Sequence, residues 1–370
     1  MPDKRKDLKV KMTEIEKARK IINGADEKIA ECFTERMRAV EKIFEYKKEH
    51  GLPIYDEKRE SELLEKNAQY IKDETLRGYY IEFQKNVMEI SKKYQSYLQS
   101  GVKIAYSGIK GAFAHIAASK LYPDGILVSY PDFASAYAAV ADGECDLAVL
   151  PIENSSAGEV GSVIDMIFHG NLYINGIYNL EISQNLLGVK GAKKSDIKTV
   201  VSHRQALDQS MDYIMENGFD INEATNTAIA AKTVAQLGDV SVAAIASIET
   251  AAIYGLDVLE RNTNKSNVNT TRFAVLSKVM TKTENENTVL LFTVSNSAGS
   301  LAKAINIIGK YNYNMVSLRS RPLKDHPWKY YFYVEIDKNV ETEIGKIMLN
   351  ELRENCDLLK VAGTFTEKKL

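Results

Sequence analysis

The stretch LVSYPDFASAYAAVADGECDLAVLPI, residues 127–152, decides the fold class of the central part of the chain. Its ends, Leu127–Tyr130 and Leu147–Ile152, are short apolar runs with β-strand character, and the alanine-rich segment Phe133–Ala141 between them has helical character. A strand, a helix and a second strand in succession are typical of an α/β fold. Further strand-like runs follow the same pattern at Val102–Tyr106, Thr199–Ser202 and Val242–Ala246. We therefore predict an α/β domain over residues 101–280.

The preceding part of the chain, residues 1–99, has the composition of an all-helical domain. Lys, Glu and apolar residues recur there at helical spacing, and few glycines interrupt them. Gly51-Leu52-Pro53 predicts the end of a very long first helix, and Asp56 is placed to cap a second. The segment at Lys72-Asp73 leads to a third helix. One helix is too long to fold back alone, which suggests a homodimer as the smallest assembly, or a tetramer.

The C-terminal part has a different pattern after the polar stretch TKTENEN, residues 281–287. Its expected elements are strand 288–295, helix 299–310, strand 315–321, strand 329–336, helix 341–354 and strand 357–365. This βαββαβ order is the α+β ferredoxin-like arrangement. We therefore predict three domains, at 1–99, 101–280 and 288–370.

The overall composition limits the class of partner. The net charge is -2 and the signs are interspersed, so no long-range field favours nucleic acid. Cys32, Cys145 and Cys356 stand far apart, which excludes a disulfide framework and the CxxC spacing of zinc sites. No run reaches the roughly 18 apolar residues of a membrane span, and the N-terminus lacks the apolar core of a signal peptide. We expect a cytoplasmic protein that binds a small molecule, with no membrane partner and no metal or other cofactor.

Charged residues share the apolar face expected on the first helix. That face runs through Ile15, Ile22, Ile29, Phe33, Val40 and Phe44. Its charged members are Arg19, Arg36 and Lys47. On the second helix one face holds Asp56, Arg59, Glu60 and Leu63, and on the third Ser91 and Gln95 interrupt the stripe of Met88 and Leu98. Each residue alone fits a snorkelling side chain or a structural ion pair. The whole set is costly to bury unless a ligand compensates, and a ligand with two carboxylates, an ether oxygen and a hydroxyl would match it.

The run DEKIAECFTERMRAVEKIFEYKKEHGLPIYDEKRESELL, residues 26–64, with SKKYQ at 91–95, resembles the all-helical chorismate mutase family. The resemblance implies a Claisen rearrangement of chorismate to prephenate, which needs a held conformer and donors to the breaking ether bond. It assigns the two substrate carboxylates to Arg19, Arg36 and Arg59, with Arg19 contributed by the other subunit. It assigns the ether oxygen to Lys47 and Gln95. It places Asp56, Glu60 and Ser91 around the ring hydroxyl and the carboxylates.

Polar clusters in the central domain stand at predicted strand-to-helix junctions, where open α/β sheets bind ligands. They are Ser107–Gly111, Glu153–Ser156, Ser202–Gln209 and Asn269–Phe273. Taken singly, each also fits an ordinary turn, a helix N-cap or a strand edge. Their order and spelling, in AYSGIKGAFAHIAA, LAVLPIENSSAGEV, VVSHRQALDQ, NTAIAA, AAIAS and NTTRFAVL, resemble the prephenate dehydratases over residues 102–277.

This second resemblance implies a two-lobed α/β domain that converts prephenate to phenylpyruvate in the cleft between its lobes. Thr271 is then the main catalytic candidate, and Asn154, Ser202 and Gln209 position the substrate. Further substrate-binding candidates are Ser107, Gly111, Glu153, Ser155, Arg272 and Phe273. Thr271 can stabilise the departing hydroxyl, and Glu153 or His115 are candidates to assist it.

Residues 288–365 resemble an ACT domain, a small unit that binds amino acids at a subunit interface. The candidate regulatory residues lie in two turns, Ala298-Gly299-Ser300-Leu301 and Arg319-Ser320-Arg321-Pro322. Dehydratases usually carry Glu-Ser-Arg-Pro at the second turn, so Arg319 replaces an acid. The three resemblances together imply a bifunctional enzyme of phenylalanine biosynthesis with feedback by L-phenylalanine. Two alternatives remain: a dehydratase that prefers arogenate and has a structural helical domain, and a non-catalytic amino-acid sensor.

Overall fold

The computed structural model describes residues 13–52, 57–264, 269–281, 286–323 and 328–370. The chain divides into two compact units, Met1–Gly101 and Val102–Leu370, and each is described by itself. Within the described residues no helix has both the length and the apolar composition needed to cross a membrane.

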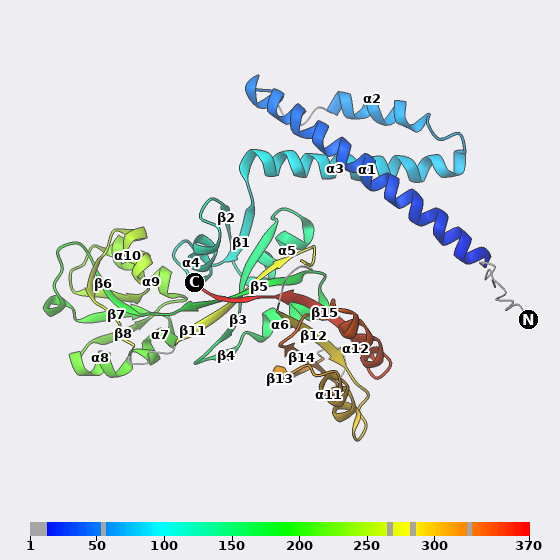
Figure 1. Cartoon of the computed structure of the whole chain (residues 1–370). Helices are drawn as coiled ribbons and strands as arrows, with labels where there is room; N and C mark the ends of the chain where they lie inside the picture. Colours follow the sequence, from blue (N-terminus) through cyan, green and yellow to red (C-terminus); the bar gives the residue numbers. More distant parts are fainter. Residues whose placement is uncertain (1–12, 53–56, 265–268, 282–285, 324–327) are drawn as a thin grey trace, which may run out of the picture. The chain divides into compact units, whose positions relative to one another are not determined.

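The described residues of the first unit form three helices, as predicted (Figure 1). They are α1 (Glu14–Glu49), α2 (Glu57–Ala68) and α3 (Glu74–Ser100). Thr13 and Glu16 form a reciprocal capping box that starts α1. The carboxylate of Asp73 accepts the backbone N–H of Thr75 at 2.8 Å and so caps α3. Pro53 and the predicted cap Asp56 lie outside the described residues.

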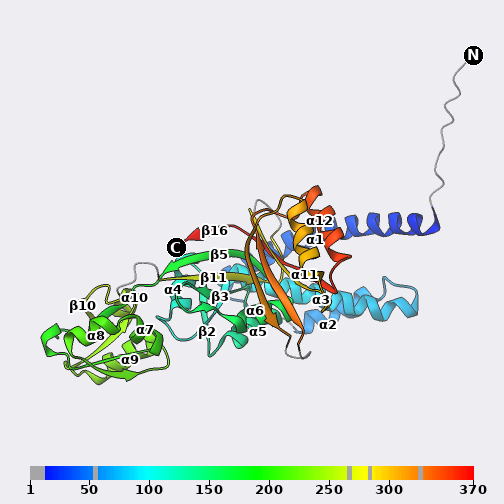
Figure 2. The same ribbon diagram turned by 90° about the horizontal axis from the view of Figure 1, so that it is seen from below.

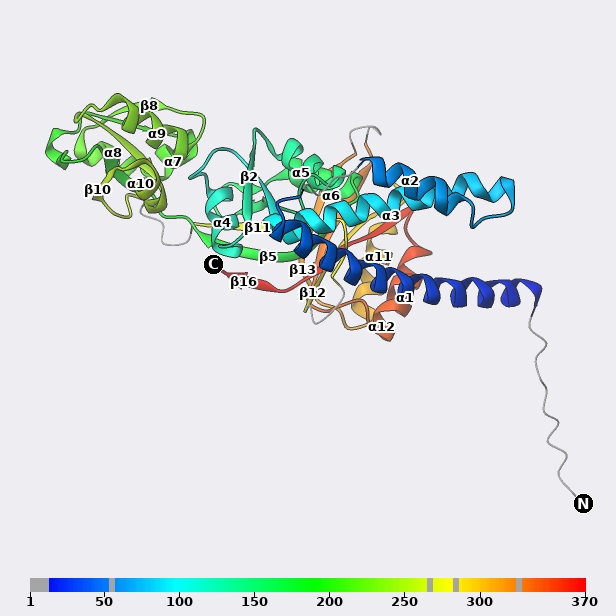
Figure 3. The same ribbon diagram turned by 90° about the horizontal axis from the view of Figure 1, so that it is seen from above.

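The apolar face of α1 is buried only toward its C-terminal end. Val40 and Phe44 are each 7% exposed, whereas Ile15 is 65%, Ile22 is 57% and Ile29 is 51% exposed. The expectation of a continuous buried face is therefore wrong for the N-terminal half of α1 within one chain. Figure 3 shows the reason, because this half of α1 runs away from α2 and α3.

The first lobe of the second unit is built on a mixed sheet. Its strands are β1 (Lys103–Ser107), β2 (Ile126–Tyr130), β3 (Leu147–Asn154), β4 (Gly158–Glu159), β5 (Tyr173–Glu181) and β11 (Thr270–Ser277). Its helices are α4 (Phe113–Leu121), α5 (Phe133–Asp142) and α6 (Gly161–His169). β1 pairs in parallel with β2 and β3, and β11 runs antiparallel between β3 and β5. The strand–helix–strand order predicted around residues 127–152 is confirmed.

The second lobe holds a separate sheet (Figure 1). Its strand order is β10-β6-β9-β7-β8. Its strands are β6 (Asn185–Gly188), β7 (Thr199–Ser202), β8 (Asp220–Glu223), β9 (Val242–Ala246) and β10 (Asp257–Glu260). Its helices are α7 (Arg204–Gln209), α8 (Met211–Asn217), α9 (Thr227–Leu237) and α10 (Ile248–Tyr254), with a 3₁₀ turn at Lys194–Asp196. The chain enters this lobe after β5 and returns before β11. The two crossings are bonded to each other, since Ile182 N–H donates to the Asn269 carbonyl at 2.7 Å.

The C-terminal segment has the predicted βαββαβ order, with the sheet order β13-β14-β12-β15. Its elements are β12 (Asn287–Thr293), α11 (Ser300–Lys310), β13 (Met315–Pro322), β14 (Tyr330–Ile336), α12 (Glu343–Arg353) and β15 (Leu358–Phe365). This sheet joins that of the first lobe where Gly363 pairs with Ile174. A Cβ on Gly363 would lie 2.0 Å from the Ile174 carbonyl oxygen, so the join requires glycine. The chain ends in β16 (Glu367–Lys369), which runs beside β5 (Figure 2).

Candidate functional site

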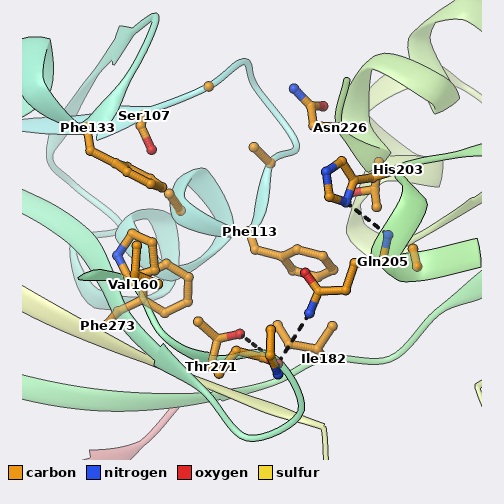
Figure 4. Close-up of a pocket in the computed structure, with 18 of the residues that line it drawn as sticks. Ser107, Phe113, Phe133, Val160, Ile182, His203, Gln205, Asn226, Thr271 and Phe273 are labelled. Atoms are coloured by element: carbon orange, nitrogen blue, oxygen red, sulfur yellow. Dashed lines mark hydrogen bonds between the residues drawn. The ribbon is translucent and has the colours of Figure 1, made fainter. Parts of the chain in front are cut away.

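A cavity of about 520 Å³ in the second unit is lined by residues of both lobes (Figure 4). This volume is in the range of small-molecule sites. The first lobe contributes β3, β11 and the starts of α4 and α5, and the second contributes the starts of α7 and α9. Five predicted dehydratase residues line the cavity, namely Ser107, Asn154, Gln209, Thr271 and Phe273.

Asn154 is the centre of a directed set of hydrogen bonds on the cavity wall. Its Oδ1 accepts the backbone N–H groups of Ser156 at 3.0 Å and Ala157 at 2.9 Å. The amide is therefore oriented with Nδ2 toward β11, where it donates to Thr271 Oγ1 at 2.9 Å. Because Thr271 Oγ1 accepts this bond, the Thr271 hydroxyl proton remains available to a molecule in the cavity.

A chain of hydrogen bonds with the same donor-to-acceptor direction runs from Asn154 to the second lobe. Asn154 Nδ2 also donates to Asn269 Oδ1 at 2.9 Å, and Asn269 Nδ2 donates to Gln209 Oε1 at 2.9 Å. This arrangement leaves Gln209 Nε2 as a buried donor with no hydrogen-bond partner. An unsatisfied buried donor is costly, so a ligand acceptor in the cavity would complete the set.

His203 and Gln205 line the second-lobe side of the cavity. His203 Nδ1 accepts the Gln205 backbone N–H at 3.3 Å, which leaves the proton of a neutral imidazole on Nε2. Figure 4 shows this second ring nitrogen directed into the cavity. Gln205 Nε2 donates to Asn154 Oδ1 at 3.3 Å and so links the two lobes.

The described lining of the cavity contains neither lysine nor arginine. Positive potential in the cavity comes from helix N-termini instead. The N-cap of α4 is Ala112, which offers no side-chain acceptor to the first backbone N–H groups. Asp132 caps α5 and Asn226 caps α9, and both line the cavity. Uncapped N–H groups and the helix dipole favour a carboxylate at the start of α4.

Three of the predicted residues support the cavity wall instead of lining it. Ser202 is fully buried, and its hydroxyl donates to the Ile245 carbonyl on the neighbouring strand. Ser155 Oγ accepts the Thr270 backbone N–H at 3.0 Å. Gly111, with φ of 95°, packs against the second lobe, where a Cβ would lie 3.4 Å from the Thr250 methyl group.

Arg272 and Glu153 lie on the opposite sheet face from the cavity. Successive strand residues point to opposite faces, so Arg272 cannot share the direction of Thr271, nor Glu153 that of Asn154. Arg272 Nη1 lies 3.0 Å from Glu153 Oε2, and its Nη2 lies 2.9 Å from Glu335. Burial would raise the pKa of Glu153, but ion pairs with Arg319 and Arg272 hold it below its ordinary value. Arg272 thus contacts β14 and Glu153 contacts Arg319 on β13, so the structure brings neither of these predicted substrate-binding residues to the cavity.

His115, named above as a candidate to assist Thr271, is also absent from the cavity lining. Its ring is 9% exposed and packs edge-on against Tyr106, with centroids 5.1 Å apart. Burial, with a smaller effect of Lys110, lowers the pKa of His115. His115 is therefore a core residue in this structure.

The predicted regulatory residues occupy a helix start and an edge strand. Ala298, Gly299, Ser300 and Leu301 form the turn into α11, where Gly299 has the left-handed φ of 85°. Arg319, Ser320, Arg321 and Pro322 belong to β13. Burial alternates along β13, and both arginine side chains are directed at acids outside the C-terminal segment. Arg319 lies 2.6 Å from Glu153, and Arg321 pairs with Asp165 at 2.8 Å.

In the helical unit, the predicted mutase residues of α1 and α3 come together. Arg36 donates to the Ser91 hydroxyl, and burial lowers the pKa of Arg36. Gln95, one turn after Ser91, is 8% exposed and its Oε1 has no partner. Glu60 on α2 forms an ion pair with Lys92 of α3, at 3.2 Å.

The remaining mutase candidates lie at other positions. Lys47 is half-buried near the end of α1, and Arg59 is exposed on α2. Arg19 is exposed on the N-terminal half of α1, and Asp56 lies outside the described residues. Within the described part of the chain, no group of three His, Cys, Asp or Glu side chains is arranged to hold a metal ion.

Sequence reasoning missed several residues that line the cavity. His203, Gln205 and Asn226 lie in the quoted runs VVSHRQALDQ and NTAIAA. Their position at helix starts beside strand ends was the available signal. Phe133, the first residue of α5, had the same signal, whereas Glu159 had none, because only the tertiary fold brings Glu159 to the cavity.

Two family models match the chain. The prephenate dehydratase family model matches residues 104–281, and the chorismate mutase type II model matches residues 18–96. A bifunctional chorismate mutase/prephenate dehydratase of Buchnera aphidicola is 31% identical over 367 residues, covering 94% of this chain and 95% of the relative.

Solved structures give a similar picture for the second unit. The structure of GqqA, a quorum-quenching acylase, has a TM-score of 0.67 and 30% identity, and the match covers 72% of this chain and 98% of that one. A prephenate dehydratase of Arthrobacter aurescens in complex with L-Phe has a TM-score of 0.66 at 24% identity, covering 72% of this chain and 90% of that one. The similarity to the Arthrobacter aurescens structure is a similarity of fold.

Proposed function

The chain belongs to the family of bifunctional chorismate mutase/prephenate dehydratases, and from that premise we propose how its residues carry out the two reactions and their regulation. The enzyme rearranges chorismate to prephenate and converts prephenate to phenylpyruvate in phenylalanine biosynthesis. We assign the mutase to 1–99, the dehydratase to 101–280 and regulation to 288–370, in a cytoplasmic enzyme.

The dehydratase reaction needs a hydrogen-bond donor at the departing ring hydroxyl. Prephenate loses carbon dioxide, and the electron pair of the broken C–C bond aromatises the ring as hydroxide leaves. Thr271 is the proposed donor, because the bond from Asn154 Nδ2 leaves its hydroxyl proton free. This observation carries the dehydratase proposal. We propose that His203 Nε2–H donates a second hydrogen bond to the leaving oxygen, which takes its proton from water.

The substrate carboxylates need donors of their own. We propose the uncapped start of α4 for one of them and Gln209 Nε2 for an acceptor on the other side of the ring. Ser107 and Phe273 complete the wall that holds the ring. Ser202 contributes indirectly, by fixing β7 and thereby the start of α7.

The mutase reaction requires only that chorismate be held in a compact conformer with donors at the ether oxygen. We propose Lys47 and Gln95 as those donors and Arg36 as a carboxylate ligand. The hydrogen bond from half-buried Arg36 to buried Ser91, one turn before buried Gln95, supports this proposal. Arg59, Glu60, Ser91 and Asp56 are proposed to complete the contacts.

We further propose that the mutase site is completed by a second copy of the chain. The N-terminal half of α1 presents Ile15, Ile22 and Ile29 at more than half of their full exposure. A stripe of this kind is typical of an interface. Arg19 lies on the same half of α1, so dimerisation would bring it to the partner's site.

For regulation, we propose that residues 288–370 form an ACT domain that binds L-phenylalanine. Support comes from the βαββαβ order, from the left-handed Gly299 at the start of α11, and from the L-Phe complex of the Arthrobacter aurescens dehydratase. Equilibrium binding tests this proposal, and an absence of affinity at millimolar phenylalanine would exclude it.

A product assay tests the catalytic proposal. Purified protein is incubated separately with chorismate, prephenate and arogenate. Phenylpyruvate from the first two substrates supports the assignment, phenylalanine formed mainly from arogenate supports the arogenate alternative, and the absence of any product supports a sensor.

A further inference from the structure

One wall of the dehydratase cavity is attached to the C-terminal segment. Ala157, Gly158, Glu159 and Val160 line the cavity on and beside β4, and α6 starts at the next residue, Gly161. Three side chains of the C-terminal segment hold this wall and helix from behind. They are Arg321 on β13, Tyr331 on β14 and Lys360 on β15.

Arg321 makes the most extensive of these contacts. Its Nε donates to Asp165 Oδ1 at 2.8 Å, its Nη2 donates to Asp165 Oδ2 at 3.2 Å, and its Nη1 donates to Glu159 Oε1. The side chain of Arg321 is 18% exposed and that of Asp165 is 13% exposed. A planar guanidinium can bridge two carboxylates in this way, whereas a lysine ammonium cannot reproduce the fork.

Gly161 shows that the wall is shaped around this guanidinium. A Cβ built on Gly161 would lie 2.2 Å from Arg321 Nη1 and 2.5 Å from its Cζ. Alanine at residue 161 would therefore displace the Arg321 side chain while suiting the first turn of a helix.

Tyr331 and Lys360 hold the rest of α6. The Tyr331 hydroxyl donates to Asp165 Oδ1 at 2.6 Å, and its ring stacks on Phe168 with centroids 4.1 Å apart. Lys360 Nζ donates to the carbonyls of Ile167 and Gly170, each at 2.6 Å, at the C-terminal end of the helix. The helix that follows the cavity wall is thus held along its length by one rigid sheet.

We propose that Arg321 is a positioning residue for the dehydratase reaction, which sets the Glu159–Val160 wall of the cavity through its bonds to Glu159 and Asp165. In this structure the guanidinium of Arg321 is bonded to Asp165 and Glu159 of the catalytic part of the chain, and is not a ligand for an amino acid effector. Where β13 moves when the effector binds, Arg321 carries that movement to the cavity; this last step rests on the regulatory role proposed above.

The test compares Arg321→Met and Gly161→Ala, which remove or displace the same guanidinium from opposite sides. Gly309→Ala is the matched control for the glycine change, because a Cβ at Gly309 meets nothing within 4 Å. Arg353→Met is the control for the arginine change, since Arg353 is exposed on α12. Each full-length protein is assayed with prephenate and with chorismate, and its affinity for phenylalanine is measured.

We expect both test variants to lower kcat/KM for prephenate by about 10- to 100-fold, the range that a misplaced wall produces. Mutase turnover in the same samples and phenylalanine affinity should stay at wild-type values, as should all activities of the two controls. Glu159→Gln removes one ion pair without changing side-chain size, and in combination with Arg321→Met its effect should be less than additive. If Arg321→Met fails to fold, Glu159→Gln alone tests the contact between Arg321 and the cavity wall.

Wild-type dehydratase activity in both Arg321→Met and Gly161→Ala would overturn the proposal. So would loss of phenylalanine binding with dehydratase activity retained, because that result would make Arg321 an effector ligand. An inactive wild-type protein would refute the proposed function itself, which keeps the two failures distinct.

Discussion

Replacing Thr271 with valine removes one hydroxyl from the dehydratase cavity while nearly preserving the shape of the side chain. Thr271 is 9% exposed, and Asn154 Nδ2 retains its bond to Asn269 Oδ1 at 2.9 Å after the change. Loss of a single hydrogen bond of this kind costs on the order of 1 kcal/mol of stability. The variant is therefore expected to remain folded.

The catalytic effect should be much larger than the effect on stability. A donor aimed at charge that develops in the transition state contributes about 2.7–4 kcal/mol, or roughly 10²- to 10³-fold in kcat. We expect a loss of this size in phenylpyruvate formation by Thr271→Val. Thr271→Ser keeps the hydroxyl and should keep most of the activity.

The assay follows phenylpyruvate from prephenate and chorismate consumption in the same sample. Mutase activity is the internal control for folding and concentration, since it belongs to the other unit. Wild-type kcat for Thr271→Val, or an equal loss in Thr271→Ser, would refute the proposed role of the hydroxyl.

Three further predictions concern assembly and stability. Ile22→Asp should convert a dimer to a monomer and abolish mutase but not dehydratase activity; a fully active monomer in sedimentation experiments would contradict this. The second prediction concerns Glu153. Burial opposes its ionisation, yet Arg319 and Arg272 hold its folded-state pKa below the ordinary 4.5. The ionised side chain therefore stabilises the fold above pH 4.5, and this stabilisation is lost as pH falls through the folded-state pKa. Melting temperatures of wild type and Glu153→Gln should converge in acid, and a constant difference would refute this. Lys360→Met should lower the free energy of unfolding by on the order of 2–3 kcal/mol, because it leaves the carbonyls of Ile167 and Gly170 unsatisfied. Urea denaturation measures this change, and an unchanged urea midpoint would contradict the prediction.

The element order could be predicted because each element carries its own periodic signal. β9 occupies Val242–Ala246 as predicted, and α5 differs from its predicted segment by one residue at its end. Apolar runs bounded by turn residues are local properties of a sequence. They do not depend on which partners the elements find.

The side on which a residue acts could be predicted less well. Thr271 and Arg272 are neighbours in one run, yet Thr271 faces the cavity and Arg272 faces β14. Strand alternation implies this split, although only the fold shows which side holds the cavity. Ile15 and Ile22 illustrate a second limit, because a periodic stripe defines an apolar face without identifying what covers it.

The most direct test of two independent sites on one chain uses Lys47→Ala and Thr271→Val with chorismate as substrate. Lys47→Ala should leave chorismate unconsumed yet convert added prephenate to phenylpyruvate, whereas Thr271→Val should consume chorismate and accumulate prephenate. Wild-type consumption of chorismate by Lys47→Ala, or wild-type phenylpyruvate formation by Thr271→Val, would contradict the assignment of the two reactions to these sites.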